Sequence, residues 1–442
     1  MTQPLPDQLI PFLERQAASL LLYQSVMQGS VTQAFLVVLQ TLQQEDDLAC
    51  LRAYGNWFQA LVSADLSWQA YLLHQILHSD NPFTQQVQQN QEISPALVAA
   101  VQHDLRALQQ LYHCDGKQLS QWVQAKVGLE TAPVVWEPLQ CAPSLPELNL
   151  DAELNTDLDT SDWANLLPAL SNHYRQFGAG LFASYRAFRW QQGELVGVAY
   201  PDPIQLEELV GYEAQKRALQ QNTEALLAGY PALHVLLYGS RGSGKSSLVK
   251  ALLSEYGAKG LRLLEVSKAD LRDLPVIVDQ LRSAPQKFII FVDDLSFEED
   301  DDAYKALKVV LEGNITARPS NVVVYATSNR RHLIREFFDD RPRPREADEI
   351  HHWDTVQEKL SFSDRFGLTL TFEPANQDTY LAIVHHLAQI STIPIAAADL
   401  EFQALQWATR HNGRSGRTAR QFIDFLQTHL KTTHTATAEA SG

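Results

Sequence analysis

The stretch HVLLYGSRGSGKSSL, residues His234–Leu248, decides the fold of this chain. It begins with an apolar run, Val235–Tyr238, that is typical of a buried parallel strand. The run ends at Gly239–Ser246, GSRGSGKS, which fits the pattern G-x-x-x-x-G-K-[ST]. Apolar pairs at helical spacing follow over Leu248–Leu253. A strand, a glycine loop and a helix in this order are the context that a phosphate-binding loop requires.

The residue types of this loop suit a polyphosphate. Glycines let backbone N–H groups surround an anion, and the N-terminus of the following helix adds the positive end of its dipole. Lys245 is expected to reach the β- and γ-phosphates, and the Ser246 hydroxyl is expected to bind Mg²⁺. The loop residues expected to contact the nucleotide are Gly239, Ser240, Arg241, Gly242, Ser243, Gly244, Lys245, Ser246 and Ser247.

Bulk composition sets the class of protein. The chain has 442 residues, of which 45% are hydrophobic, so two or three domains with packed cores are expected. Its 35 basic and 52 acidic residues give a formal net charge of −17, which disfavours broad attraction to nucleic acid or to an anionic membrane. The three cysteines, Cys50, Cys114 and Cys141, have no metal-type spacing and no disulfide pattern. No signal peptide or membrane-length apolar run is evident, so a cytoplasmic protein with no membrane partner is expected.

The chain divides into regions of different pattern. Residues 1–130 carry apolar residues at helical spacing, with breaks at Gly29-Ser30, at Ser79–Pro82 and at Asp115-Gly116, and predict a helical interaction or assembly region. Residues 131–160 are rich in proline and acid and predict a flexible linker. Residues 161–200 predict a helical connector before the nucleotide domain.

The second half predicts an α/β nucleotide domain over residues 201–373. Besides the strand before the glycine loop, short apolar runs predict four strands at Leu261–Val266, Lys287–Val292, Val322–Ala326 and Leu368–Phe372. Helical segments separate them, which indicates an open five-stranded parallel sheet of the P-loop type. Residues 374–431 return to helical patterning and predict a C-terminal helical lid, and residues 432–442 predict a disordered tail.

Polar residues follow two of these strands. Asp293 and Asp294 end the run KFIIFVDD, where Asp293 is expected to hold Mg²⁺ and Asp294 to orient or deprotonate an attacking water. Asn329 ends VVVYATSN and is a candidate to polarise water or the γ-phosphate. Strand tips of such a sheet meet at the ligand, which favours these roles over ordinary turn residues.

Two arginine motifs complete the candidate site. Arg365, in SFSDRFG, is a candidate arginine finger supplied by a neighbouring subunit, the alternative being an ion pair with Asp364. GRSGRTAR places Arg414, Arg417 and Arg420 three residues apart on one helix face. Either this face is a basic patch for nucleic acid, or one arginine, Arg417, reaches the phosphates from a helical lid.

Together these motifs resemble the AAA+ ATPases over about Leu206–Leu430. The resemblance matches Gly239–Ser246 to Walker A, Phe291–Asp294 to Walker B, Asn329 to sensor 1, Arg365 to the arginine finger and Arg417 to sensor 2. It implies that Val210 and Gly211, in the segment Leu209–Tyr212, border adenine, that ATP and Mg²⁺ are bound, and that subunits form a homo-oligomeric ring, with a hexamer as one candidate.

The segments FVDDLSFE, YATSNRRHL, SDRFGL and SGRTARQF further resemble an uncharacterised bacterial AAA+ family, catalogued as domain-of-unknown-function family 815. That resemblance implies ATP binding and hydrolysis but names no substrate. The second Walker B acid is Asp294 instead of the glutamate of many AAA+ proteins, which leaves the rate of hydrolysis open. Glu298 is a nearby substitute, or else part of a solvated acidic run.

Two functions compete at this stage. The first is an ATPase that remodels or loads a protein client, which the N-terminal helices select. The second is an ATP-gated binding switch for a protein or DNA, with little turnover. A small-molecule P-loop kinase is a weaker third option. The loop Arg331–Arg345 keeps DNA binding open, although its interspersed acids favour a mixed solvated insertion.

Overall fold

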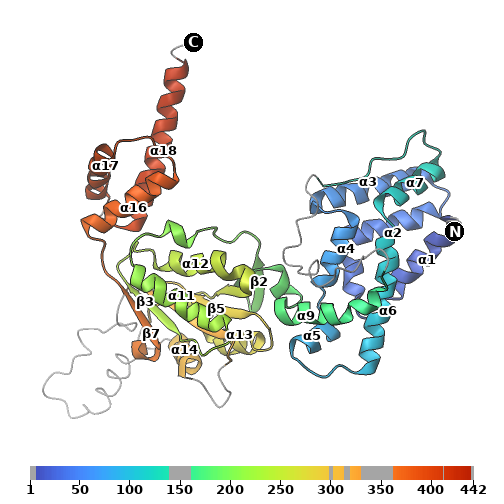
Figure 1. The fold of residues 1–442 in the computed structure, drawn as a ribbon, viewed down its shortest axis with the longest axis horizontal. Helices are drawn as coiled ribbons and strands as arrows, with labels where there is room; N and C mark the ends of the chain where they lie inside the picture. The colour runs from blue at the N-terminus through green and yellow to red at the C-terminus, as the bar shows by residue number, and fades with distance from the viewer. Residues whose placement is uncertain are drawn as a thin grey trace. The chain divides into compact units, whose positions relative to one another are not determined.

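The protein consists of two compact units, Met1–Ser184 and Tyr185–Gly442. Figure 1 shows the computed structural model, which describes residues 6–138, 161–297, 302–312, 319–329, 362–411 and 413–439. Each unit buries a hydrophobic core of its own, so each is a separate folded body.

The described part of the first unit is helical, and its helices begin where the sequence predicts breaks. Ser30 opens a helix after Gly29, and the side chains of Asn81 and Asp115 accept hydrogen bonds from the first turns of two others. The α-helices are α1 (Pro6–Ala18), α2 (Ser30–Leu42), α3 (Asp47–Ala64), α4 (Trp68–Leu77), α5 (Pro82–Gln88), α6 (Pro95–His113), α7 (Gly116–Val127), α9 (Leu167–Phe177) and α10 (Leu181–Ser184). Two 3-10 turns, η1 (Gln24–Gln28) and η2 (Trp163–Leu166), join them.

Aromatic rings fill the centre of the helical unit. Phe35 of α2 stacks on Trp68 of α4 with 4.2 Å between ring centroids, and Trp57 of α3 meets Trp68 edge-on. The carboxylate of Asp104, fully buried on α6, accepts hydrogen bonds from three consecutive backbone N–H groups, those of residues 21–23. These bonds compensate the burial of the charge. Cys50 and Cys114 are buried free thiols, and Cys141 lies outside the described residues.

Two predicted boundaries of this region are wrong. Residues 131–138 pack along the helices instead of forming free linker, because Tyr54 donates to the Val134 carbonyl at 2.8 Å and Ser120 donates to the Pro133 carbonyl. Residues 161–184 belong to the first unit instead of a connector. Buried Tyr174 donates to the carbonyl of Ile76 at 2.7 Å, which ties α9 to α4. The rest of the predicted linker, residues 139–160, lies outside the described residues.

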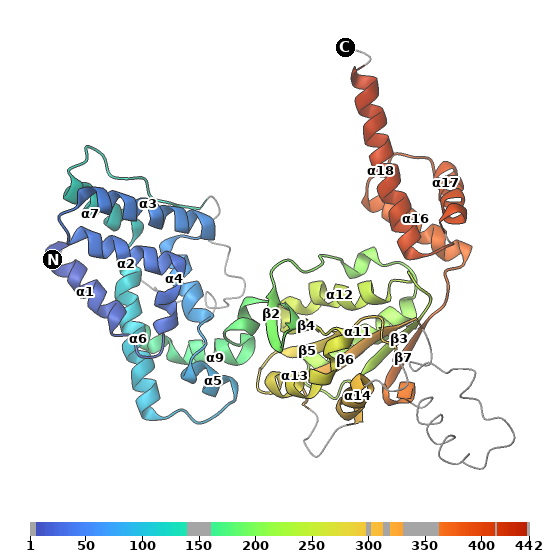
Figure 2. The same cartoon turned by 180° about the vertical axis from the view of Figure 1, so that it is seen from behind.

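The second unit is built on a seven-stranded sheet of order β2-β1-β4-β5-β6-β3-β7. All five predicted strands are present and pair in parallel, with β3 between β6 and β7. Figure 2 shows this sheet from behind. The strands are β1 (Ala187–Gln191), β2 (Glu194–Val198), β3 (Val235–Gly239), β4 (Leu261–Glu265), β5 (Lys287–Val292), β6 (Val322–Ser328) and β7 (Leu368–Phe372).

The hairpin β1–β2 corrects the prediction of helix up to residue 200. β1 pairs in parallel with β4 and antiparallel with β2, so the sheet gains two strands at one edge. The loop residues Gln192 and Gly193 both have positive φ, 54° and 84°, as a two-residue type I′ turn requires. Phe188 and Trp190 are buried on β1 and the arginine between them is exposed, which is the two-residue period of a strand.

Helices cover the sheet on both faces, since nearly every side chain of β5 and β6 is buried. α11 and α12 bury Leu219, Leu226 and Val249 against one face. In Figures 1 and 2 the sheet lies between α12 on one side and α13 and α14 on the other. The α-helices that cover the two faces of the sheet are α11 (Glu213–Leu227), α12 (Lys245–Tyr256), α13 (Leu274–Leu281) and α14 (Asp302–Glu312). The 3-10 turns of the second unit are η3 (Leu206–Glu208), η4 (Gly257–Lys259), η5 (Lys268–Asp273) and η7 (Phe362–Arg365).

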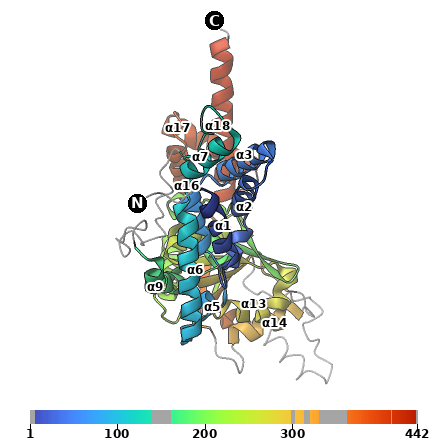
Figure 3. The same cartoon turned by 90° about the vertical axis from the view of Figure 1, so that its right-hand side faces the viewer.

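Three helices form the predicted lid: α16 (Gln377–Ile390), α17 (Ala397–Arg410) and α18 (Gly416–Glu439). Tyr380, Leu400, Ala404 and Phe422 make a small core between them. The prediction of disorder from residue 432 is wrong, because α18 continues to Glu439 and projects beyond α16 and α17 (Figure 3). Extending an existing helix avoids the cost of nucleation, and Ala and Glu have high helix propensity. Within the described ranges, no helix is long and apolar enough to cross a membrane.

Candidate functional site

The glycine loop joins β3 to α12 at the carboxyl edge of the sheet. Gly239, Gly242 and Gly244 have φ values of 143°, 75° and 89°, a region that favours glycine. A Cβ on Gly239 would lie 1.9 Å from the carbonyl oxygen of Phe372, so the loop leaves β3 in close contact with the end of β7. The loop therefore reaches the start of α12 with backbone amides available for an anion.

Lys245 is the first residue of α12 and is 6% exposed. Its Nζ donates to the carbonyl oxygens of Gly239 at 3.0 Å and Ser240 at 2.7 Å, and lies 3.4 Å from Oδ1 of Asn329. Burial lowers the pKa of Lys245, while the charges of Asp293 and Asp294 act in the opposite direction. The ammonium is thus fixed by weak neutral acceptors, which a phosphate would replace with charged ones.

The carboxylate of Asp293, directly after β5, faces the loop. Its Oδ1 accepts a hydrogen bond from Ser246 at 2.6 Å and another from Thr327 of β6. A hydroxyl and a carboxylate in contact are oxygen ligands of the kind that Mg²⁺ takes beside substrate phosphates. The described residues contain no group of three or more His, Cys, Asp or Glu side chains arranged to hold a metal ion, and Mg²⁺ at a nucleotide site does not require one. Ser246 and Asp293 therefore fit the predicted metal position.

Asp294 and Asn329 also meet. Nδ2 of Asn329 donates to Oδ1 of Asp294 at 2.7 Å, so the ends of β5 and β6 converge as predicted. Asp294 adopts a left-handed conformation with φ of 50°, and its backbone N–H donates to Oγ1 of Thr327 at 3.0 Å. Thr327 therefore fixes the main chain of Asp294, and Asn329 fixes its side chain.

These groups line one cavity of about 620 Å³ between the sheet and the lid. Loop residues 241–247 line it together with Asp293, Asp294, Asn329 and Arg417. Val210 and Gly211, expected beside adenine, line it with Tyr212, Phe372 and Ile383, which make that part of the wall apolar. Gly239 and Ser240 do not line it; their carbonyls bind Lys245 behind the loop.

The three arginines around the start of α18, of which Arg414 precedes the helix, differ in their partners. Arg414 donates to Gln377 within the lid, and Arg420 pairs with Glu208 at 2.8 Å. Arg417 lines the cavity, and its guanidinium has no hydrogen bond or ion pair with the residues that the structure describes. Its backbone N–H donates to the loop carbonyl of Gly242 at 3.4 Å, a long hydrogen bond. Arg417 is therefore the member of the set with an uncompensated charge at the cavity.

Arg365 does not join this group. It ends η7 and forms an ion pair with Glu312 at the end of α14, and it does not line the cavity. The pairing with Asp364 weighed above is thus replaced by one with Glu312. Glu298 and the arginines of the loop Arg331–Arg345 lie outside the described residues.

Sequence reasoning missed three residues of this site. Thr327 joins both Walker-type acids, Glu208 pairs with Arg420, and Tyr212 contacts the Phe372 ring with 5.0 Å between centroids. The Thr-Ser-Asn end of the β6 run was a usable signal for Thr327, because a threonine near the tip of a strand lies on the same sheet face as the residue opposite it on the neighbouring strand. Nothing local to Glu208 signals its partner, which lies 212 residues away.

Replacing Thr327 with valine should test the link between the acids. The isosteric change removes a donor to Asp293 and an acceptor for the Asp294 N–H, so we expect a loss of about 1–2 kcal/mol in the free energy of unfolding. Misplaced acids should also lower any ATP turnover of the chain roughly tenfold. Urea unfolding and steady-state kinetics measure the two effects. Ser328→Ala is the control, since Ser328 bonds the Leu295 carbonyl; equal turnover in both variants would contradict the role of Thr327.

Comparison with known proteins bears on this geometry. The family model described as "Protein of unknown function (DUF815)" matches residues 183–430, more than half of the chain. The chain belongs to the DUF815 family. The matched residues cover the sheet, the glycine loop and the lid, so the family match includes the whole α/β core that the sequence predicts.

More distant similarities accompany this match. A curated protein of Brugia malayi, described as "Probable spastin homolog", is 26% identical to this chain in an alignment of 155 residues, and the match covers 29% of this chain and 34% of the relative. The chain thus spans about a third of that relative's length. Two solved structures of variants of Thermotoga maritima RuvB are 17% and 19% identical, cover 50% and 52% of this chain and 72% and 68% of theirs, and have TM-scores of 0.33 and 0.37.

Proposed function

We propose that this chain binds Mg-ATP in the cavity between sheet and lid and hydrolyses it. The observation that carries the proposal is the meeting of Lys245, Ser246, Asp293 and Asn329 at the loop, through contacts of 2.6–3.4 Å. Five basic side chains, Lys216, Arg241, Lys245, Arg417 and Arg420, line the cavity with three acidic ones in a chain of net charge −17. This local excess of positive charge favours a polyanionic ligand.

Each residue has a role in this proposal. Bound Mg-ATP would supply the γ-phosphoryl group that water attacks, with the metal charge offsetting the phosphates. The loop amides and Lys245 bind the phosphates, Ser246 and Asp293 hold the metal, and Arg417 contacts the γ-phosphate from the lid. Val210 and Gly211 border the base at the apolar wall.

Asp294 is proposed to orient the attacking water and to accept its proton. Asn329 occupies one oxygen of this carboxylate, which leaves the other oxygen for water. The same amide lies 3.4 Å from the Lys245 ammonium, so Asn329 couples the phosphate-binding lysine to the water-binding acid. A shorter acid than glutamate is compatible with this chemistry because its position is determined by Thr327 and Asn329.

Arg365 is proposed to act in a neighbouring subunit's site. Arg365 does not line the cavity of its own subunit and forms an ion pair with Glu312. The side chain of Arg365 is 18% exposed, and that of Glu312 is 43% exposed. Assembly into a homo-oligomeric ring would exchange this partner for the γ-phosphate of the neighbour, whose charge is larger. Turnover per subunit is then expected to rise with protein concentration.

The biological output is proposed to be remodelling or loading of a protein client, which the helical unit selects. An ATP-gated switch with little turnover is the second candidate, favoured by the substitution of aspartate at position 294. The two differ in a measurable way: a motor hydrolyses many ATP molecules per subunit, whereas a switch binds ATP tightly and captures its partner without turnover. A salt-dependent DNA-binding assay separates a nucleic-acid partner from a protein one.

Replacing Lys245 with alanine is expected to weaken ATP binding by about 100-fold, because hydrogen bonds from a charged group to two phosphates contribute roughly 3 kcal/mol. Calorimetric titration with Mg-ATP measures this loss. Lys250→Ala is the matched control: Lys250 lies on the same helix but pairs with Asp202 at the surface, so its loss should leave ATP affinity unchanged. If wild-type turnover never exceeds that of Lys245→Ala at any concentration, hydrolysis is not a function of this chain.

A further inference from the structure

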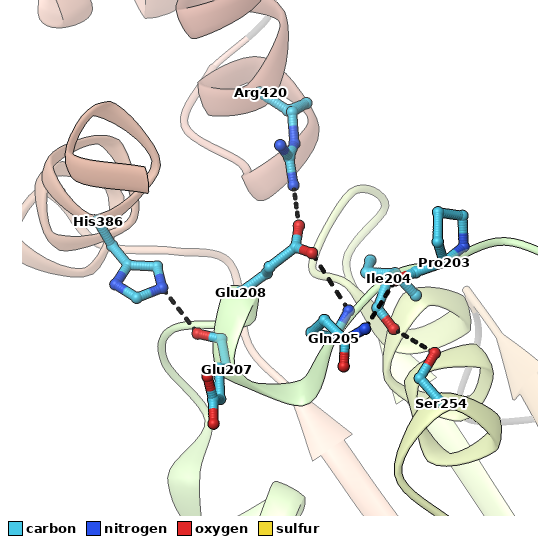
Figure 4. A network of polar contacts seen from close by, with 8 residues as sticks. All are labelled: Pro203, Ile204, Gln205, Glu207, Glu208, Ser254, His386 and Arg420. Atoms are coloured by element: carbon cyan, nitrogen blue, oxygen red, sulfur yellow. Dashed lines mark hydrogen bonds and ion pairs between the residues drawn. The ribbon is translucent and has the colours of Figure 1, made fainter. Parts of the chain in front are cut away.

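A short segment before α11, which we name the strap (Pro203–Glu208), contacts both the sheet layer and the lid (Figure 4). On the sheet side, Ser254 of α12 donates to the carbonyl of Ile204 at 2.8 Å, and Leu206 is buried in the core beneath α12. The Glu208 side chain also accepts from the backbone N–H of Gln205 at 3.3 Å. The strap is therefore anchored on the helix that carries the phosphate-binding loop.

On the lid side, two helices bind the strap. Nη2 of Arg420 on α18 donates to Oε2 of Glu208 at 2.8 Å, and Nε2 of His386 on α16 lies 2.7 Å from the carbonyl oxygen of Glu207 (Figure 4). The Glu208 side chain is 25% exposed and that of Arg420 is 42% exposed, so solvent screens this pair only in part. Both residues also line the nucleotide cavity.

Because Arg420 and Arg417 lie on the same helix, α18, the contact of Arg420 with Glu208 also affects the position of Arg417. Arg417 precedes Arg420 by three residues, so the two side chains leave the helix on neighbouring parts of one face. The first turn of α18 also touches the loop, because a Cβ on Gly242 would lie 3.0 Å from Cβ of Ser415 and 3.4 Å from Cβ of Arg417. Any rotation or shift of α18 that breaks the pair with Glu208 would move Arg417 relative to the loop.

We propose that Glu208 and Arg420 form a latch that sets the position of Arg417 over the nucleotide. This inference rests on the proposed function of the cavity. Glu208 and Arg420 are positioning residues in this latch. The charge of Arg420 is neutralised by Glu208, whereas the guanidinium of Arg417 contacts the phosphates. The latch makes the lid's geometry depend on the strap, which leads directly into the segment beside the base.

The test compares Glu208→Gln, Arg420→Gln and the charge exchange Glu208→Arg/Arg420→Glu in the full chain. Amide hydrogen exchange in nucleotide-free protein measures how firmly the start of α18 is held, independently of ATP hydrolysis. We expect faster exchange at residues 415–420 in both single variants. With Mg-ATP, both single variants should lose about tenfold in kcat, the scale expected when a contacting group is misplaced, with a change in Kd of about threefold or less. The charge exchange should restore most of the kcat.

Arg414→Gln is the matched control, because Arg414 lies just before α18 and donates to Gln377 within the lid. It should leave both exchange at residues 415–420 and kcat at wild-type values. If Glu208→Gln and Arg420→Gln also leave hydrogen exchange at residues 415–420 and kcat unchanged, the latch is refuted. The proposed ATP site is still supported in that case if Lys245→Ala abolishes ATP binding. If Arg420→Gln alone weakens ATP binding as strongly as Lys245→Ala, Arg420 is a phosphate ligand and the positioning role is wrong.

Discussion

Replacing Arg365 with alanine is expected to lower kcat for ATP hydrolysis by about 10³, because an arginine finger stabilises the charge of the transition state by that order. ATP affinity should change little, since Arg365 does not line the cavity of its own subunit. Steady-state turnover and equilibrium binding of ATP measure the two quantities on the same preparation. Loss of affinity equal to the loss of kcat would show that Arg365 acts on its own nucleotide.

Mixing two inactive variants tests whether the arginine crosses between subunits. Arg365→Ala retains an intact loop, and Lys245→Ala retains an intact Arg365. In a mixed assembly, the loop of the first would receive the arginine of the second, so activity should return on mixing. Glu312→Gln is a useful companion, because it removes the partner of Arg365 without touching the cavity. A mixture that remains inactive, although the variants are shown to co-assemble, contradicts a shared active site.

Replacing Gly239 with alanine is expected to destabilise the α/β unit by about 3–5 kcal/mol, through overpacking added to backbone strain. The new Cβ would lie 1.9 Å from the Phe372 oxygen and 2.7 Å from its carbonyl carbon, and both atoms are backbone at the end of β7. Neither can move without separating β3 from β7. Urea unfolding followed by hydrogen exchange in peptides of β3 and β7 reports this unit separately from the helical one.

Gly244→Ala distinguishes crowding from conformational strain. Gly244 also has positive φ, 89°, but its added Cβ would meet nothing within 4 Å. Only the cost of a left-handed alanine should remain, about 1–2 kcal/mol. Equal destabilisation by the two substitutions would show that close contact with β7 is not what requires glycine at position 239.

The strands and the loop were predictable because their signals are local. A fully buried strand needs a short apolar run, and Lys287–Val292 and Val322–Ser328 supply one each, so periodicity was enough to find β5 and β6. The hairpin β1–β2 was missed because its strands have only five residues each, too few for a two-residue period to stand out from the helical pattern before them. The turn Gln192-Gly193 lacks the Asn-Gly or Asp-Gly pair that signals a type I′ turn most strongly, and only its positive φ values identify it.

The residues directly after strands were also predictable as site candidates, since parallel strands end at one edge of the sheet. Asp293, Asp294 and Asn329 do meet there. Their individual geometry was not predictable. That Thr327 bonds both acids and that Asn329 lies between Asp294 and Lys245 depends on the register of β5 against β6, which no single segment encodes.

Local sequence therefore determined the class of ligand and the kind of fold, because the glycine loop and the apolar runs require only their own residues. Tertiary structure decided which charges are free. The equal spacing of the three arginines does not separate them, and the sequence favours Arg417 through its resemblance to sensor 2. Folding brings Gln377 to Arg414 and Glu208 to Arg420 and leaves Arg417 uncompensated among the described residues. The same holds for Arg365, whose partner Glu312 lies 53 residues away. Electrostatic interactions depend on distance in space, so chain spacing alone cannot rank such residues.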